Sequence, residues 1–236
     1  MEKAVNSHQS ERPQAKARCS ASRPACMTFV SLLFAIASLG AQNGTSVQEI
    51  LAQTVRGYED GGAAVYVLLG RVSQRFNFPQ GVEFDGETPA GIASIKVADG
   101  TVADIVSELV GRMPDYKWQV IDDVLNVMPR QPRNTVLDVR IHTLRLRRCA
   151  PVDFSHAIAS IPEVKRWLKE NRVVEQTLIA VVGHIEFPPS EPRISIEARD
   201  LTLREALNRI VKTPGLLRWA VTRYGPNGKY LSIIVE

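Results

Sequence analysis

The chain has 236 residues, of which 44% are apolar and 23% charged, as in an ordinary folded protein long enough for one large or two small domains. Its formal net charge is +4, but residues 1–41 hold five of the 29 Lys and Arg and two of the 25 Asp and Glu. The rest of the chain is therefore near neutral, and its charge gives no reason to expect nucleic acid as a partner.

The N-terminal segment has the layout of a secretory signal peptide. The uncharged run "TFVSLLFAIASL" spans Thr28 to Leu39 and follows several basic residues. At about 12 residues it is shorter than the roughly 20 of a membrane-spanning helix. We expect export to the periplasm with cleavage before Gln42. An uncleaved anchor in the inner membrane is the alternative, and Met27 is an alternative start.

The expected exported chain has too few cysteines for a disulfide bond. Cys19 and Cys26 lie in the predicted leader, so Cys149 remains alone. No intrachain disulfide and no cysteine zinc cluster is therefore available to the mature protein. Its stability is expected to come from a hydrophobic core.

The first elements follow the leader directly. Residues 43–62 predict a linker with a short helix, capped by Ser46, carrying Val55 on its apolar stripe and ended by "DGG". Residues 63–76 place apolar side chains at helical spacing and predict an amphipathic helix. The alternation in "VEFD", residues 82–85, predicts a short strand.

A compact pattern follows over residues 92–127. Residues 92–97 read as a strand, and Thr101 with Asp104 forms the capping box of a helix. Strands at 118–120 and 124–127 then pair as a hairpin around "DD". The pattern is strand, capped helix and hairpin.

The proline-broken stretch "RQPRN", residues 130–134, predicts a domain boundary. A strand over 137–146 follows, with a bulge near Thr143. A helix begins near Phe154 and restarts at "SIPE", where Ser160 is the expected cap. Two more strands are predicted, at 173–183 and 194–196.

The earlier pattern then recurs. Shifting the chain by 101 residues aligns "DGTVADIVSELV" with "DLTLREALNRIV" without a gap. Thr101 aligns with Thr202 and Trp118 with Trp219, while Glu205 replaces the box carboxylate. The sequence therefore predicts an α+β fold of two small tandem domains, each βαββαβ-like with mixed strands and two helices. Their expected ranges are 63–129 and 134–236, after a signal peptide over 1–41 and the linker over 42–62.

The recurring unit resembles the secretin and TonB short N-terminal domain. "ISIEARDLTLREALNRIVKTPGLLRWAV" carries Thr202, Glu205, Ala206, Leu207 and Leu216 where that family has its cap, box carboxylate and helix core. The resemblance implies a periplasmic α+β module that docks onto other envelope proteins, found at secretin pores and ahead of TonB-dependent outer-membrane proteins. Nothing in the chain predicts a pore of its own, so only the adaptor role is expected.

Catalytic residues are not expected. The three candidate histidines have no recognised ligand spacing with one another or with nearby carboxylates, and Cys149 lacks a nucleophile's glycine-rich context. We predict no catalytic, cofactor-binding or metal-binding residue and no cofactor. The groups considered are His142, His156 and His184 with Asp138, Asp153 and Glu186.

Two other features favour structural roles. "RLRR", Arg145 to Arg148, is the densest basic cluster; it could contact phosphate or acidic lipid, but a solvated strand edge is favoured. The matching places of Trp118 and Trp219 favour a shared core role over ligand stacking.

The function expected from the sequence is a non-enzymatic, exported interaction protein of a Gram-negative-type envelope. Its partner would be a secretin-like or TonB-system component, and its own oligomeric state is left open. The alternative is a periplasmic ligand-binding protein or small hydrolase that uses the cleft between domains. A third reading is a fragment of a secretin-like assembly.

Overall fold

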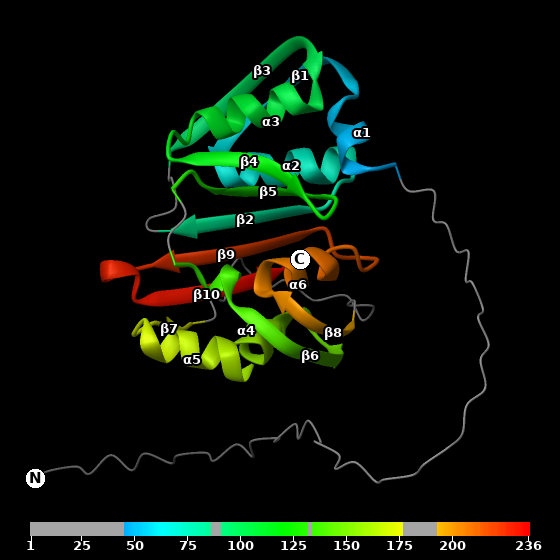
Figure 1. Cartoon of the computed structure of the whole chain (residues 1–236). Coiled ribbons are helices and arrows are strands. Elements are labelled where there is room, and N and C mark those ends of the chain that lie inside the picture. The colour runs from blue at the N-terminus through cyan, green and yellow to red at the C-terminus, as the bar shows by residue number, and fades with distance from the viewer. Residues whose placement is uncertain (1–44, 86–90, 132–133, 177–192) are drawn as a thin grey trace, which may run out of the picture. The chain divides into compact units, whose positions relative to one another are not determined.

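The structure is a computed structural model that describes residues 45–85, 91–131, 134–176 and 193–236. These residues form an α+β fold of six α-helices and ten strands, which confirms the predicted fold class. Asn43–Glu236 forms one compact unit by its internal contacts (Figure 1). The predicted leader lies outside the described residues.

The first half of this unit, residues 45–131, alternates helices and strands and ends in a hairpin. Its elements are α1 (Val47–Leu51), β1 (Thr54–Ala64), α2 (Val65–Phe76), β2 (Gln80–Asp85), β3 (Ile92–Thr101), α3 (Val102–Gly111), β4 (Tyr116–Ile121) and β5 (Val124–Pro129).

The second half, residues 134–236, has the same order with two additional helices, α5 and the short η2. Its elements are η1 (Val136–Asp138), β6 (Arg140–Cys149), α4 (Pro151–Ala159), α5 (Pro162–Glu170), β7 (Val174–Glu175), β8 (Ile194–Thr202), α6 (Leu203–Ile210), β9 (Arg218–Tyr224), η2 (Pro226–Gly228) and β10 (Tyr230–Val235).

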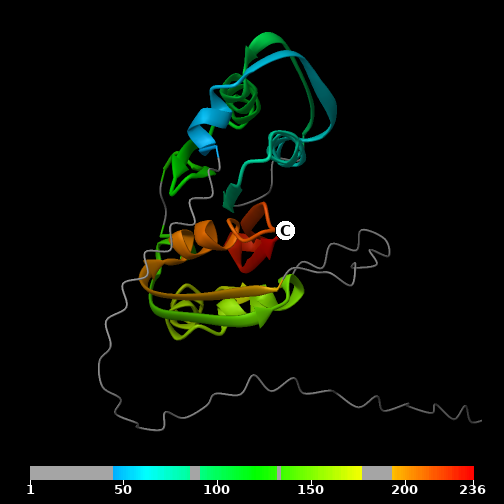
Figure 2. The same cartoon turned by 90° about the vertical axis from the view of Figure 1, so that its right-hand side faces the viewer.

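The pairings within one half recur in the other. β1 pairs antiparallel with β3 as β6 does with β8, and β2 runs parallel to β5 as β7 does to β10. Each half ends in an antiparallel hairpin, β4–β5 or β9–β10. In Figure 2 the helices of the first half lie between its two-stranded sheet and its hairpin. The sequence repeat is therefore a repeat of topology.

Both capping boxes form as predicted. The amide of Asp104 donates to the Thr101 hydroxyl at 3.2 Å, and the Thr101 amide donates to the Asp104 carboxylate at 2.7 Å. Thr202 and Glu205 make the same pair of bonds at 3.2 and 2.6 Å. Each box satisfies backbone donors that the first turn of a helix would otherwise leave without partners.

The start of the first half differs from the expectation. α1 and its Ser46 cap form, but the helix ends at Leu51, and Val55 lies in β1 rather than on a helical stripe. Gly57 and Gly62 adopt positive φ, and the register shifts after Gly61, which lets the strand bend along β3. The buried side chain of Tyr58 anchors this strand in the core.

The second half corrects three further details. Residues 136–138 form the short helix η1 rather than the start of a strand. Ile161 is the N-cap of α5, while the Ser160 hydroxyl donates to the carbonyl of His156. The register shift in β6 lies between Leu146 and Cys149, not at Thr143. Of the strand expected over 173–183, the structure describes only β7.

One sheet passes through both halves. Its described strands follow the order β4-β5-β2-β9-β10-β7, with the parallel pair β2–β9 at its centre. The hydrophobic core nevertheless has two clusters, one per half. The halves therefore have separate interiors and a shared backbone sheet.

The capping boxes give a pH dependence that can be measured. The backbone amide of Thr202 donates to the Glu205 carboxylate and holds the pKa of that carboxyl below its usual value of 4.5. A lowered pKa stabilises the fold above about pH 4.5, and this contribution is lost as the pH falls through the folded-state pKa. The free energy of unfolding of Glu205→Gln should therefore fall less than that of the wild type between pH 7 and pH 3 in urea titrations. Equal pH slopes would contradict this role of the box.

Candidate functional site: the seam between the halves and its open counterpart

The centre of the sheet depends on one close approach. In the parallel pair β2–β9, Gly81 lies opposite Trp219, whose side chain is 1% exposed. A Cβ on Gly81 would overlap the indole ring, so only glycine leaves room for it there. The β2 backbone therefore covers the tryptophan of the second half. We call this junction of β2 with β9 and α6 the seam.

An ion pair crosses the seam beside that contact. The carboxylate of Glu83 on β2 accepts from Nη2 of Arg204 on α6 at 2.6 Å, and their side chains are 9% and 13% exposed. Arg204 stands in the first turn of α6, where the helix dipole is unfavourable for a cation. Glu83 offsets both that dipole and the lost hydration of the guanidinium.

Asn208 on α6 connects three elements across the seam. Its amide oxygen accepts from the indole of Trp219 at 2.9 Å, and its amide nitrogen donates to the carbonyl of Ile121 on β4 at 3.2 Å. Val124, at the start of β5, packs into the core of the second half. The seam thus combines a strand ladder, an ion pair and a buried amide network.

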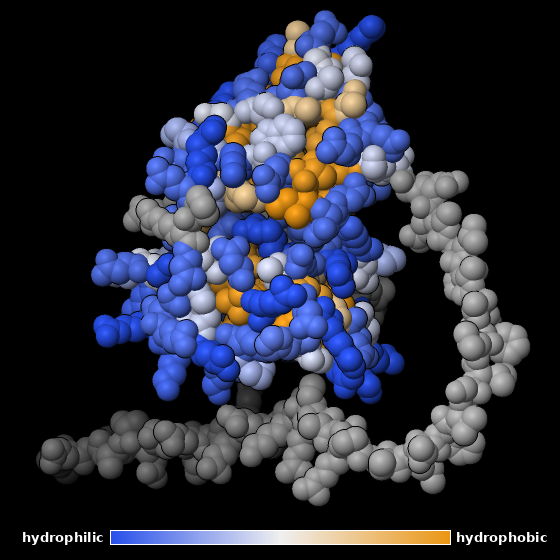
Figure 3. All heavy atoms as spheres, viewed as in Figure 1, coloured by the Kyte–Doolittle hydropathy of each residue, from blue (hydrophilic) through white to orange (hydrophobic). Residues whose placement is uncertain are grey.

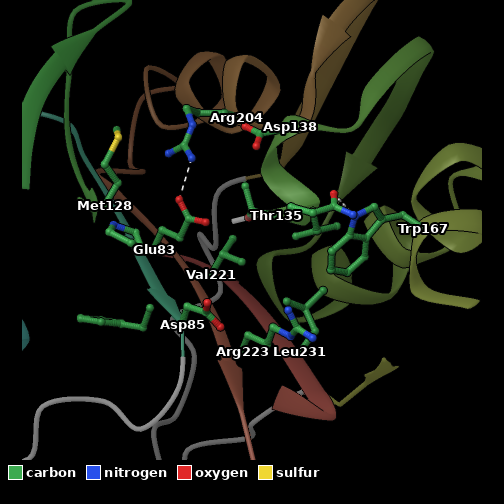
Figure 4. A pocket seen from close by; sticks show the side chains of 14 residues that line it. Glu83, Asp85, Met128, Thr135, Asp138, Trp167, Arg204, Val221, Arg223 and Leu231 are labelled. Atoms are coloured by element: carbon green, nitrogen blue, oxygen red, sulfur yellow. Dashed lines mark hydrogen bonds and ion pairs between the residues drawn. The ribbon is translucent and has the colours of Figure 1, made fainter. Parts of the chain in front are cut away.

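A small cavity of about 130 Å³ lies beside the ion pair (Figure 4). Nη1 of Arg204 is buried there and has no hydrogen-bond partner among the described residues. Asp138 of η1 stands at the rim: the residue is exposed overall, yet the partial burial of its carboxyl raises its pKa, against the opposing effect of Arg204. Trp167 closes another side, with its indole donating to Asn134 at 3.1 Å. The space suits a few water molecules and is below the roughly 300 Å³ at which ligand pockets begin.

The first half has a surface that corresponds to the one that β2 covers on the second half, and no described strand covers it. A groove of about 330 Å³ lies between α1, α3 and β4, and apolar side chains are exposed there on the first half (Figure 3). Four of its lining residues correspond, by the shift of 101 positions, to residues at the seam. Thr101, Ala103, Trp118 and Val120 of the groove match Thr202, Arg204, Trp219 and Val221.

The match includes the segments before the first strand of each half. α1 borders the groove as η1 borders the cavity. The amide of Val102 donates to the carbonyl of Gln53 at 3.1 Å, and that of Leu203 donates to Val139 at 3.0 Å. The groove on the first half therefore corresponds to the surface that β2 covers on the second half. No described strand lies over the groove.

Trp118 is less buried than its counterpart Trp219, which β2 covers. Its indole donates to the hydroxyl of Ser107 at 3.2 Å, the counterpart of the bond from Trp219 to Asn208. Yet Trp118 is only half-buried. The core role predicted for both tryptophans holds in full for Trp219, while Trp118 packs against the core of the first half and also lines the groove.

β4 also presents backbone groups at its outer edge. Because Arg130 donates to the carbonyl of Asp115, every second residue from Asp115 faces β5. The amides and carbonyls of Trp118 and Val120 therefore point away from β5. In β9 the corresponding groups, of Trp219 and Val221, face β2, since Arg218 pairs with Glu236 on β10.

The polar residues singled out in the sequence do not meet in one site. His142 pairs with Asp200 at 3.2 Å on an exposed strand surface, and His156 is exposed on α4. Cys149 is half-buried and its thiol donates to the carbonyl of Ala150. Asp138 borders the cavity, whereas Asp153 is exposed on α4. His184 and Glu186 lie outside the described residues.

The basic cluster is a solvated strand, as favoured from the sequence. Arg145 pairs with Glu197 across the β6–β8 sheet at 2.8 Å, with both side chains about half exposed. Arg147 and Arg148 are exposed as well. Exposed pairs of this kind contribute little to stability.

Sequence reasoning missed Glu83 and Arg204. The alternation in "VEFD" assigns Glu83 to a polar face, but Arg204 of α6 covers this residue, and Glu83 is only 7% exposed. The available signal was the replacement of Ala103 by Arg204 at an otherwise apolar position of the repeated helix.

Within the described residues, no cluster of histidine, cysteine and acidic side chains could hold a metal ion. No helix in these same ranges has both the length and the hydropathy needed to cross a membrane. Comparisons with models of protein families, with curated proteins and with solved structures found no match.

The close approach at Gly81 can be tested by a single methyl group. Gly81→Ala should lower the free energy of unfolding by about 1 to 3 kcal/mol, because the added Cβ overlaps the indole of Trp219. In a Trp219→Leu background, the same change at Gly81 should cost less than it does in the wild type, because no indole ring occupies the space of the Cβ. Gly111→Ala is the matched control, since its Cβ would meet nothing and alanine favours the helix. If Gly81→Ala unfolds at the same urea concentration as Gly111→Ala, the seam is not packed as described.

The ion pair can be tested by a double-mutant cycle. Glu83→Leu or Arg204→Met alone should cost about 3 kcal/mol in urea unfolding, because each leaves a buried charge without its partner. The double variant should be closer to wild type than either single variant. The exposed pair Glu59–Lys96 is the control, and Glu59→Leu should change stability by less than about 1 kcal/mol. Additive losses at the seam would contradict the coupling.

Proposed function

We propose that this protein is an exported interaction module of the cell envelope that binds a strand of another protein along the outer edge of β4. The observation that carries the proposal is the open groove beside that edge. It repeats the surface on which the second half binds β2, including the position of Trp118, but no described strand covers it.

The physical basis is strand addition. An edge strand offers unsatisfied amides and carbonyls, and a partner strand satisfies them while its side chains enter adjoining pockets. Here the outward groups of Trp118 and Val120 would supply the ladder. Leu51, Ala103 and Val120 would supply apolar contact in the groove.

The cellular setting rests on the sequence. The basic residues, the apolar run and the small residues before Gln42 support export, and the similarity of both halves to the secretin and TonB short N-terminal domain favours the periplasm. A component of a secretion or TonB-type system is accordingly the proposed partner. The proposal assigns no catalytic role and no nucleic-acid partner.

Ligand binding at the seam is the second candidate. It is favoured by Arg204, which lines the cavity and whose buried Nη1 has no hydrogen-bond partner among the described residues. The volume of about 130 Å³ and the ion pair with Glu83 favour water in that space instead. The groove at β4 therefore supports the first candidate better.

The proposal can be tested by affinity purification from the periplasm of cells that produce the full chain. Wild-type protein, expected to begin at Gln42, should recover a secretion or TonB-system component. Val120→Lys should lose that component, because it places a charge in the groove. Gln119→Lys is the matched control: it adds the same charge to the next residue, whose backbone faces β5, and should retain the partner.

Two outcomes would contradict the proposed function. One is that neither wild type nor Gln119→Lys recovers an envelope protein. The other is that Val120→Lys recovers the same protein in equal amount while remaining folded by circular dichroism.

A further inference from the structure

The pairing of β2 with β9 shows which side chains a strand needs in order to lie on the repeated surface. Gly81 lies opposite Trp219, and a side chain at position 81 would overlap the indole ring. Two residues further on, Glu83 lies opposite Val221 and pairs with Arg204. The first position therefore requires glycine, and the second requires a carboxylate.

Trp118 sets the same first requirement for a strand at β4. Its indole donates to Ser107 at 3.2 Å, and the indole of Trp219 donates to Asn208, the counterpart of Ser107, at 2.9 Å. Both rings are thus held by a bond to the same position of the repeated helix. A strand added in the manner of β2 meets the ring of Trp118 at the position where β2 has glycine.

The second requirement is different at the groove. Ala103 stands where Arg204 stands at the seam, so the groove has no guanidinium at this position that needs a carboxylate. Leu51 and Val120 also line the groove. A carboxylate opposite Val120 would lose hydration without gaining a cation, whereas an apolar side chain would bury its surface there.

The charge at the end of the strand is reversed as well. Arg223 of β9 lies opposite Asp85 of β2, whereas the counterpart of Arg223 after β4 is the exposed Asp122. The sequence of the first half is acidic, since residues 43–131 include seven Lys or Arg and twelve Asp or Glu. A cation on the partner strand would complement this charge.

We propose that the β4 edge accepts a parallel strand with glycine opposite Trp118, an apolar residue opposite Val120 and a basic residue beside Asp122. The inference rests on the proposed function, because it specifies the strand that this edge binds. The three positions alternate, so they lie on one face of the partner strand. The partner segment is therefore glycine, any residue, an apolar residue, any residue, and Lys or Arg.

Peptides based on β2 test the three positions. The first probe is the segment 79–85, PQGVEFD, with Glu83→Leu and Asp85→Lys. Added to the ¹⁵N-labelled chain that is expected to begin at Gln42, it should shift the amide resonances of β4. The same probe with Gly81→Val should bind at least about tenfold more weakly, because its side chain meets the indole. The unmodified segment should also bind at least about tenfold more weakly, because of its carboxylates.

Two variants of the chain test whether the named residues set these preferences. In Trp118→Leu, the probes with glycine and with Gly81→Val should bind within about threefold of each other, because the ring no longer fills the space. Ala103→Arg introduces the side chain found at the seam. Among probes with Asp85→Lys, this variant should bind the one that keeps Glu83 more tightly than the one with Glu83→Leu. Gln119→Leu, whose side chain lies on the other face of β4, is the control and should keep the wild-type preferences.

A fusion removes any dependence on the affinity of a free peptide. The amide of Val47 donates to the carboxylate of Asp123 at 2.8 Å, so α1 begins beside the end of β4, where a parallel strand would also end. The first probe fused directly before Gln42 should slow hydrogen exchange at the amides of Trp118 and Val120. The fusion with Gly81→Val should not slow it.

The inference is overturned if the glycine and valine probes bind the wild type equally well or protect the two amides equally, or if no probe and no fusion does either. It is also overturned if Trp118→Leu and Ala103→Arg keep the wild-type preferences. An envelope partner that is lost on Val120→Lys, but whose bound segment lacks this pattern, would refute the inference and leave the proposed function standing. Probes that show the pattern while no envelope protein is recovered would support the inference and refute the proposed function.

Discussion

The pairing of β2 with β9 is the constraint on which the rest of the structure depends. It joins two halves with separate cores into one sheet, and it requires glycine at position 81 because Trp219 occupies the space of a side chain. Around it, Glu83 forms an ion pair with Nη2 of Arg204, and Asn208 donates to the carbonyl of Ile121; both contacts cross the seam. Separating the halves would expose the indole of Trp219 and break the ion pair between Glu83 and Arg204. It would also remove the bond from the amide of Asn208 to Ile121.

The sequence predicts the parts of the fold that are specified locally. Thr101 with Asp104 and Thr202 with Glu205 identify both core helices, because a capping box depends on residues three positions apart. The hairpins are recognisable from alternation and turn residues. β1 is not, because the apolar residues after Ser46 keep helical spacing and only pairing with β3 makes the strand. Local patterns cannot represent a partner that lies some 40 residues further on.

The candidate site was harder to predict for the same reason. Alternation places Glu83 on a polar face, and this is correct only for a strand with one side in solvent. To predict the groove at β4, one must know that β2 covers the repeated surface in the second half and that no described strand covers it in the first. This difference is seen only when the two halves are compared in three dimensions. The repeat was readable from the sequence, but the difference in cover between Trp118 and Trp219 was not.

The sequence separation across the seam affects how the chain folds. Glu83 and Arg204 are 121 positions apart, whereas the capping boxes and hairpins close over short distances. Contacts of long range form slowly because the loop between them must first be ordered. Each half can thus gather its own core before β2 meets β9, and during that interval the edges of both strands are available to other molecules. A chain emerging in a crowded compartment could then exchange its first half with that of a neighbour, giving a domain-swapped pair with the same contacts at the seam.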